Sequence, residues 1–198
     1  MPSPVGHSLL GYLIYRGTGA APAERTWLTL ALYLLGANAP DLDFIPGLLL
    51  GVPARYHHGP SHSLGCAVLF ALAVSGVILF LKLGDFVRKS ITFFLLFFSH
   101  AMLDYFSTDT SLPYGVPLLW PLSSEYYIAP FAFLPDVHRS VATSTIKFIA
   151  SFFSLHNLWA VTVEAIMFIP PIFLMWVWNR RSPRSMPTSV AQTQREGS

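Results

Sequence analysis

Residues 63–81 form an apolar run of nineteen residues without a charged side chain. An α-helix rises about 1.5 Å per residue, so this run just crosses the roughly 30 Å hydrocarbon core of a bilayer. Two further apolar segments, residues 90–106 and 157–178, are also predicted as membrane spans. Such runs constrain the chain strongly, because a helix of this kind must be surrounded by lipid or by other apolar helices.

The composition supports a membrane protein. Hydrophobic residues make up 53% of the chain and charged residues only 11%, whereas soluble domains average about 25% charged. This balance excludes a disordered chain and argues against a single soluble domain. The one cysteine, Cys66, excludes an intramolecular disulfide. A net charge of +2 gives no reason to expect a nucleic-acid partner, whereas membrane lipid is an expected one.

Shorter apolar segments complete the predicted fold. Residues 7–15 and 27–37 are expected to form a helical hairpin, and residues 145–155 a partly interfacial helix. Residues 107–136 are rich in proline and aromatic side chains and predict a long loop, either a lid over a site or an aromatic belt at the membrane surface. We therefore predict an all-α fold: a polytopic membrane helical bundle with short broken helices and a long loop.

Two units are expected along the chain. Residues 1–178 are predicted to form a membrane-embedded domain. Residues 179–198 are polar and are predicted to be a disordered cytoplasmic tail.

Basic residues fall mostly on one side when the chain is threaded through a membrane. That side receives nine of the twelve: Arg16, Arg25, Lys82, Arg88, Lys89, Arg180, Arg181, Arg184 and Arg195. The other side receives Arg55, Arg139 and Lys147. Because short basic junctions face the cytoplasm, the first side is predicted to be cytoplasmic and the second extracytoplasmic.

Histidines and carboxylates gather on the predicted extracytoplasmic side. All seven histidines lie there or on helix ends that point there, and so do six of the ten acidic residues. Histidine and carboxylate together are the ligand set of zinc-like metals. The spacing of His100 and Asp104 puts both on one helical face, as in the histidine pair of zinc-protease helices. The predicted metal ligands are His7, Asp41, Asp43, His57, His62, His100 and Asp104.

Other polar residues are assigned supporting roles. Asp43 or Glu125 is expected to act as a catalytic carboxylate that takes a proton. Three further residues are expected to form hydrogen bonds that orient the metal ligands: Glu164, Ser99 and Ser61. The cofactor is predicted to be a divalent metal, zinc for preference, with one to three ions.

Five segments follow one another in the order of a known family: GHSLLGYLIY, APDLDFIPGLL, HHGPSHSLG, SHAMLDYFSTD and GVPLLWPLS. This order resembles the YdjM-like proteins, LexA-binding, inner-membrane-associated proteins regarded as metal-dependent hydrolases. The resemblance covers about residues 5–126. The third family motif usually reads His-Arg-Gly-x-Thr-His, so His57 and His62 match it, while His58 replaces the arginine.

The resemblance implies a function and a location. The family is distantly similar to zinc-dependent phospholipase C and the P1-type nucleases, which implies phosphoester hydrolysis, with a lipid-linked molecule as one candidate substrate. It also implies an inner (plasma) membrane location and allows a regulatory protein partner. The alternatives are a non-enzymatic regulatory membrane protein with a structural metal, and a metal or proton transporter. Transport favours ionisable residues along the whole span, whereas here they gather near one face.

Overall fold

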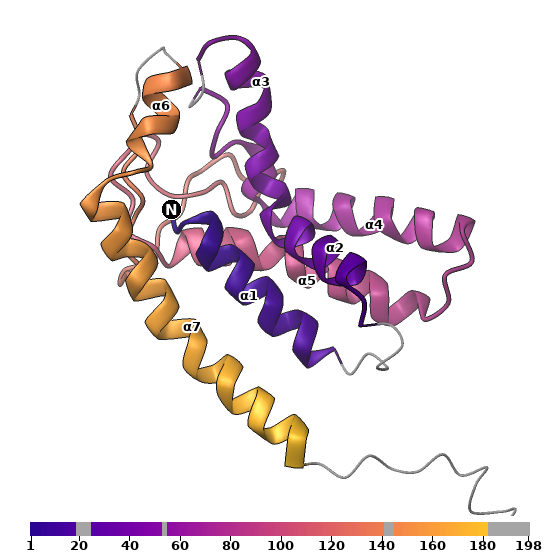
Figure 1. Ribbon diagram of the computed structural model, residues 1–198. Coiled ribbons are helices and arrows are strands. Elements are labelled where there is room, and N and C mark those ends of the chain that lie inside the picture. Colours follow the sequence, from indigo (N-terminus) through magenta and orange to yellow (C-terminus); the bar gives the residue numbers. More distant parts are fainter. Residues whose placement is uncertain (19–24, 53–54, 141–144, 182–198) are drawn as a thin grey trace, which may run out of the picture.

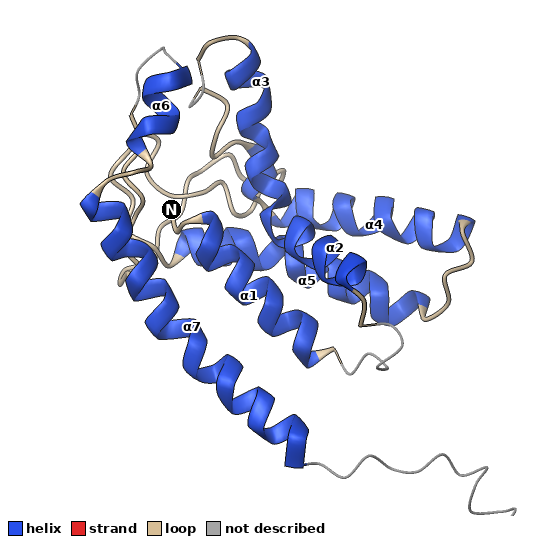
Figure 2. Cartoon of the chain, in the orientation of Figure 1, coloured by secondary structure: helices blue, strands red, loops and turns tan. Residues whose placement is uncertain are grey.

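The computed structural model describes residues 1–18, 25–52, 55–140 and 145–181. These residues form helices and loops but no strand, so the predicted all-helical class is confirmed (Figure 2). The α-helices are α1 (Pro4–Gly17), α2 (Trp27–Asn38), α3 (Phe44–Leu49), α4 (Leu64–Phe80), α5 (Phe86–Tyr105), α6 (Thr145–Ser151) and α7 (Leu155–Arg181). Two short 3-10 helices, η2 (Ala39–Asp43) and η3 (Pro60–His62), precede α3 and α4.

The helix bounds differ from the predicted ones mainly at polar ends. Helix α5 begins at Phe86 rather than at residue 90, because residues 86–89, including the basic Arg88 and Lys89, join the helical hydrogen bonding, with the Lys89 N–H donating to the Asp85 carbonyl at 3.0 Å. Helix α7 runs to Arg181, past the predicted domain boundary at residue 178. Residues 182–198, most of the predicted tail, lie outside the described residues.

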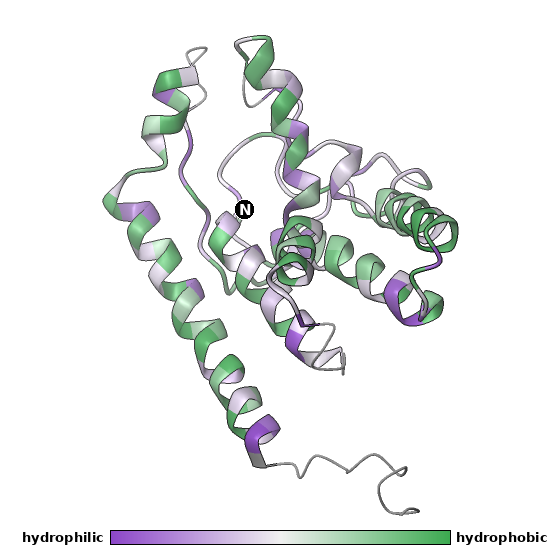
Figure 3. Ribbon diagram, turned by 45° about the vertical axis from the view of Figure 1, so that its right-hand side comes forward, coloured by the Kyte–Doolittle hydropathy of each residue, from purple (hydrophilic) through white to green (hydrophobic). Residues whose placement is uncertain are grey.

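Two helices are long and apolar enough to cross a membrane, α5 with 20 residues and α7 with 27. Helix α4, which the sequence predicts as a span, is also apolar and carries no charge but has only 17 residues. Large apolar side chains on these helices are exposed, for example Phe80 and Leu174. Hydrophilic residues gather at the α4–α5 turn and at the lower ends of α1 and α7 (Figure 3). An apolar surface with polar ends is what a lipid environment requires.

Helix α1 holds the bundle together. It packs against α2, α5 and α7, and α4 packs against α5 (Figure 1). A small core between α1, α2 and α5 consists of Tyr15, Tyr33, Ala37 and Leu96. The beginnings of α1 and α7 and the ends of α2 and α5 lie at the same end of the molecule, near the N-terminus (Figure 1). Residues at these helix ends are therefore brought together.

The long loop is folded back onto this end of the bundle. Its backbone is paired within itself at Val116 and Tyr127 and with the start of α4, where the Gly65 N–H donates to the Trp120 carbonyl at 3.1 Å. A Cβ atom at Gly65 would overlap that carbonyl oxygen, so only glycine allows the approach. The long loop is thus ordered, and its backbone hydrogen bonds attach it to the start of α4 and the end of α5.

Candidate metal centre

Local helix signals position each member of the cluster. Ser3 caps the start of α1, where its hydroxyl accepts from the backbone of Val5 and Gly6, and His7 follows one turn later. Pro40 stops α2 as an α-helix, and the chain continues as η2, which carries Asp41 and Asp43. Short η3 ends at His62, directly before Ser63 caps α4.

Four candidate ligand atoms from three elements lie close together, with each histidine nitrogen facing two carboxylate oxygens. The His100 Nε2 atom lies 3.3 Å from Asp41 Oδ1 and 3.3 Å from Asp104 Oδ2. The His62 Nε2 atom lies 3.6 Å and 3.5 Å from the same two oxygens. Metal–ligand bonds of about 2.0–2.2 Å give tetrahedron edges of about 3.3–3.6 Å. Each of these four His–Asp distances therefore matches the spacing of neighbouring ligands on one zinc ion.

The converging atoms are buried and have no hydrogen-bond partner within the described part of the chain. This holds for Nε2 of His62 and His100, for Oδ1 of Asp41 and for both carboxylate oxygens of Asp104. Unpaired buried carboxylates cost several kcal/mol, since they lose water without gaining a partner. A cation among them removes that cost, so the donor set fits a divalent metal such as zinc.

In both His62 and His100, the second ring nitrogen faces an acceptor oxygen of the protein. In His100, Nδ1 lies 2.8 Å from the Ala37 carbonyl oxygen and donates to it, which leaves Nε2 free as a ligand. In His62, Nδ1 faces the Asp43 carboxylate at 3.3 Å. Such partners fix the tautomer and the ring direction of metal-binding histidines.

His7 extends the cluster beyond these four ligands. Its Nε2 atom lies 3.7 Å from Asp104 Oδ1, and its ring stacks on that of His100 with centroids 3.6 Å apart. Both of its ring nitrogens are buried and unpaired among the described residues. Because Asp104 turns one oxygen to His62 and the other to His7, it can bridge two ions.

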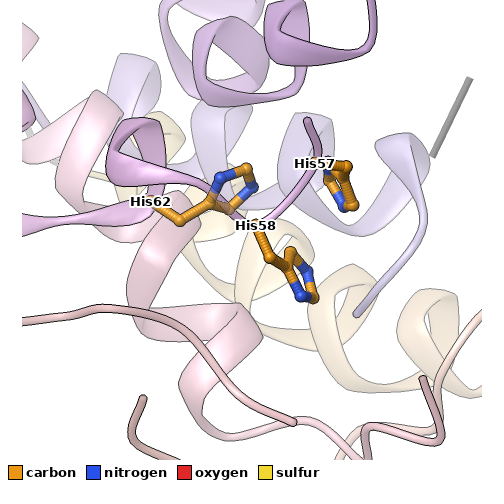
Figure 4. A group of neighbouring side chains, drawn as sticks. All are labelled: His57, His58 and His62. Carbon is orange, nitrogen blue, oxygen red and sulfur yellow. The ribbon is translucent and has the colours of Figure 1, made fainter. Parts of the chain in front are cut away.

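The loop before α4 contributes three imidazoles, which gather at the beginning of the helix (Figure 4). His57 lies beside the two carboxylates of η2: its Nδ1 atom is 2.9 Å from Asp43 and 3.7 Å from Asp41. The His58 ring lies next to His57 and His62, with centroids 4.3 Å and 5.1 Å apart, and its Nδ1 atom is 3.6 Å from the Asp109 carboxylate. That carboxylate accepts the Gly115 N–H at 2.8 Å, so His58 connects the centre to the long loop.

The charges of the loop imidazoles depend on their neighbours. Burial lowers the pKa of His57 to about 3, against the hydrogen bond to Asp43. Burial also opposes the charged form of His62, but the carboxylates of Asp41, Asp43 and Asp104 around it outweigh burial and raise the pKa of His62 to about 10. A proton on His62 therefore supplies, in the metal-free protein, part of the positive charge that these carboxylates require.

Of the carboxylates and hydroxyls expected around the ligands, some lie beside them and others do not. Asp43 lies directly behind His62 and also accepts the Ser61 hydroxyl at 2.7 Å, so Ser61 supports it as expected from the sequence. The Ser99 hydroxyl instead donates to the Leu96 carbonyl of its own helix at 2.8 Å. Glu125 is exposed on the long loop, and no ion pair joins it to the cluster among the described residues.

Glu164 supports the centre through a helix rather than through a ligand. It is fully buried in α7, and its carboxylate accepts both the backbone N–H of Ser3, at 2.6 Å, and the Ser3 hydroxyl. A carboxylate at a helix N-terminus is favourable, because unpaired N–H groups and the helix dipole face it. Glu164 thereby ties α7 to the start of α1 and fixes the turn that carries His7.

Arg139 is a basic residue near the centre that the sequence did not predict as part of the site. The Arg139 guanidinium lies within electrostatic range of several carboxylates, Asp109 most strongly and then Asp104, Asp41 and Asp43. It donates to the Ser111 hydroxyl at 3.2 Å. Arg139 follows His138 and lies close in sequence to Asp136, on the predicted extracytoplasmic side, and this position could have indicated a role in the site.

These features define a class: a helical membrane protein with a buried His/Asp cluster suited to a divalent metal. The chain belongs to the YdjM inner membrane protein family, whose model matches residues 1–183. This confirms the resemblance seen in the sequence motifs and extends it over α7. No curated protein and no solved structure is similar enough to match the chain.

Proposed function

We propose that this protein is a membrane-bound metal-dependent hydrolase that cleaves a phosphoester, with a lipid-linked molecule as the substrate class. The observation that carries the proposal is the convergence of buried, unpaired donor atoms from Asp41, His62, His100 and Asp104. A zinc ion held there would polarise a phosphoryl oxygen and lower the pKa of water from about 15.7 towards about 7.

The accessible side of the cluster supports a reacting group. The side chains of His62, His100 and Asp104 are 0–1% exposed, whereas Asp41 is 14% and Asp43 12% exposed. A substrate therefore approaches past Asp41 and Asp43. Arg139 lies within electrostatic range of both carboxylates, and a guanidinium pairs well with phosphate oxygens. We assign Arg139 to binding the phosphate.

Of the two carboxylates expected to take a proton, Asp43 is the better placed. It lies beside the cluster, 2.9 Å from His57, and is partly accessible, whereas Glu125 is exposed on the long loop. General base catalysis requires hydrogen-bond reach to the proton that is removed. We therefore assign the proton transfer to Asp43 together with its hydrogen-bonded histidines.

The proposed orientation follows from the two ends of the bundle. The cluster lies at the beginning of α1 and the end of α5, while Arg16, Lys82 and Arg180 lie at or near the opposite helix ends. Because basic ends prefer the cytoplasm, we propose that the centre faces the extracytoplasmic side and the chain after α7 the cytoplasm. The centre would then lie near the extracytoplasmic headgroup region, where lipid phosphates are found.

The test is hydrolysis of phospholipid and polyprenyl-phosphate substrates by the full chain in detergent, with and without chelator. Asp104→Asn should abolish turnover, because it removes a charged ligand with little change of volume. Arg139→Gln should raise KM more than it lowers kcat. Glu125→Gln is the matched control and should retain activity. Turnover that survives both chelation and Asp104→Asn contradicts the proposal.

A non-enzymatic role with a structural metal is the second candidate. The observation in its favour is the burial of His62, His100 and Asp104, because structural zinc sites are closed and catalytic ones keep an open position. Cobalt-substituted protein distinguishes the two: inorganic phosphate should change the visible spectrum of an open site and leave that of a closed site unchanged. A metal-loaded protein that is inert towards every phosphoester and unaffected by phosphate supports this candidate.

A further inference from the structure

A second group of metal-binding side chains lies apart from the centre. His138 follows the long loop, and His156 is in the first turn of α7. Their imidazole rings stack with centroids 3.5 Å apart and an angle of 6° between the planes. Both Nε2 atoms lie 3.6 Å from the same oxygen, Oδ1 of Asp136. The group shares no residue with the centre described above.

The three side chains are held in place by the backbone around them. The Asp136 carboxylate accepts the Thr110 hydroxyl, and the Asp136 carbonyl oxygen lies 3.0 Å from His156 Nε2. The backbone N–H of His138 donates to the Asn157 side chain at 2.7 Å, and that side chain donates back to the His138 carbonyl at 2.9 Å. The side chains are therefore held close together before any ligand binds. To bind an ion, His156 Nε2 would exchange its hydrogen bond to the Asp136 carbonyl for the metal, and the stacked rings would turn so that both nitrogens point at it.

Geometry and exposure together indicate a metal that comes from solution. A distance of 3.6 Å between donor atoms is the edge of a coordination polyhedron with bonds of about 2.2 Å. The His138 side chain is 54% exposed and the His156 side chain 34%, while the Asp136 side chain is 8% exposed. One anchored carboxylate and two accessible imidazoles leave further coordination positions open to water.

We propose that Asp136, His138 and His156 form a second, peripheral metal site that binds Zn²⁺ or a similar borderline divalent ion. Two imidazoles and one carboxylate suit such ions, whereas Mg²⁺ and Ca²⁺ prefer oxygen ligands alone. With three protein ligands and open access, the peripheral site binds more weakly and exchanges faster than the buried centre.

A metal at this site would join two parts of the fold. Asp136 and His138 belong to the segment that follows the long loop, whereas His156 belongs to α7. Between them, the Val137 N–H donates to the Met1 carbonyl at 2.9 Å, so this segment also contacts the residues that precede α1. Metal binding would therefore hold residues 136–138 against α7, next to the start of the helix that carries His7.

The experiment titrates metal-stripped full-length protein in detergent with Zn²⁺ at fixed pH. The wild type should show a tight class of sites and one weaker site, and the double variant His138→Ala/His156→Ala should lose only the weaker one. Lys147→Ala, an exposed change on nearby α6, is the control and should match the wild type. Because the two histidines are exposed, the variant is expected to fold, which its thermal unfolding in detergent checks.

A second readout separates a metal site from ordinary packing of two histidines. Amide hydrogen exchange of residues 136–138 should slow at least severalfold when Zn²⁺ fills the weaker site, and this protection should be absent in the double variant. Equal Zn²⁺ stoichiometry in wild type and double variant would overturn the proposal. So would a weaker site that Lys147→Ala removes as well.

Discussion

Replacement of Asp43 by asparagine tests how the centre is built. Asp43 uses two oxygens for three partners: Oδ1 lies 2.9 Å from His57 Nδ1, and Oδ2 lies 2.7 Å from the Ser61 hydroxyl and 3.3 Å from His62 Nδ1. Asparagine keeps the shape but has one acceptor oxygen and no charge. It therefore loses at least one charge-assisted hydrogen bond, worth about 1.5–3 kcal/mol.

The magnitude of the effect follows from the position of Asp43 behind His62. Loss of an outer partner of a metal-binding histidine typically lowers metal affinity 10–100-fold, or about 1.4–2.7 kcal/mol. This range agrees with the loss of one charge-assisted hydrogen bond. Asp104→Asn removes a ligand that faces both His62 and His100, so it should cost more than 100-fold.

The assay is competition for Zn²⁺ between the full chain in detergent and a chromogenic chelator at one pH. The expected order of affinity is wild type equal to Glu125→Gln, then Asp43→Asn, then Asp104→Asn. Glu125→Gln makes the same chemical change at an exposed position and serves as the control. The reasoning is refuted if Asp43→Asn is as damaging as Asp104→Asn, or if it has no effect on Zn²⁺ affinity.

The remaining predictions concern pH, packing and topology. The carboxylates raise the pKa of His62 to about 10, so this imidazole is protonated at neutral pH without metal. Because Zn²⁺ must displace that proton, the affinity of the protein for Zn²⁺ should rise up to about tenfold per pH unit between pH 6 and 8. Gly65→Ala should lower the thermal midpoint, at a cost of about 1–3 kcal/mol, because its Cβ overlaps the long loop, whereas Gly76→Ala, with open space around it in the same helix, should be neutral or stabilising. In protein without its native cysteine, Asp85→Cys should react with impermeant reagents from the cytoplasm and Ser111→Cys from the opposite side; the reverse pattern would contradict the proposed orientation.

Much of the fold follows from local signals that the sequence displays. Long uncharged runs require helices in lipid, and Ser3, Thr26 and Ser63 mark helix starts because their hydroxyls accept backbone N–H groups. The pairing of His100 with Asp104 is likewise local, since a spacing of four residues returns to the same helical face. Helix ends at polar residues were less predictable, as at the start of α5, because polar side chains are compatible with both a turn and a helix.

The partners of buried side chains depended on packing instead. Glu164 was expected to support a histidine, yet it accepts from Ser3, more than 150 residues earlier in the chain, because α7 lies beside the start of α1. His58 faces Asp109 because residues before α4 and after α5 meet at one end of the bundle. No spacing rule relates residues so far apart in sequence.

The sequence by itself determined the helical class, the family and the kinds of residue that gather at one end of the helices, because hydrophobic length, capping and ligand chemistry are properties of short segments. Tertiary structure alone decided which donors face each other. It placed the Nε2 atoms of His62 and His100 at 3.3–3.6 Å from oxygens of Asp41 and Asp104, and it left Glu125 on the surface. The physical reason is that coordination geometry depends on differences of tenths of an ångström between separate elements, and only their packing sets those differences.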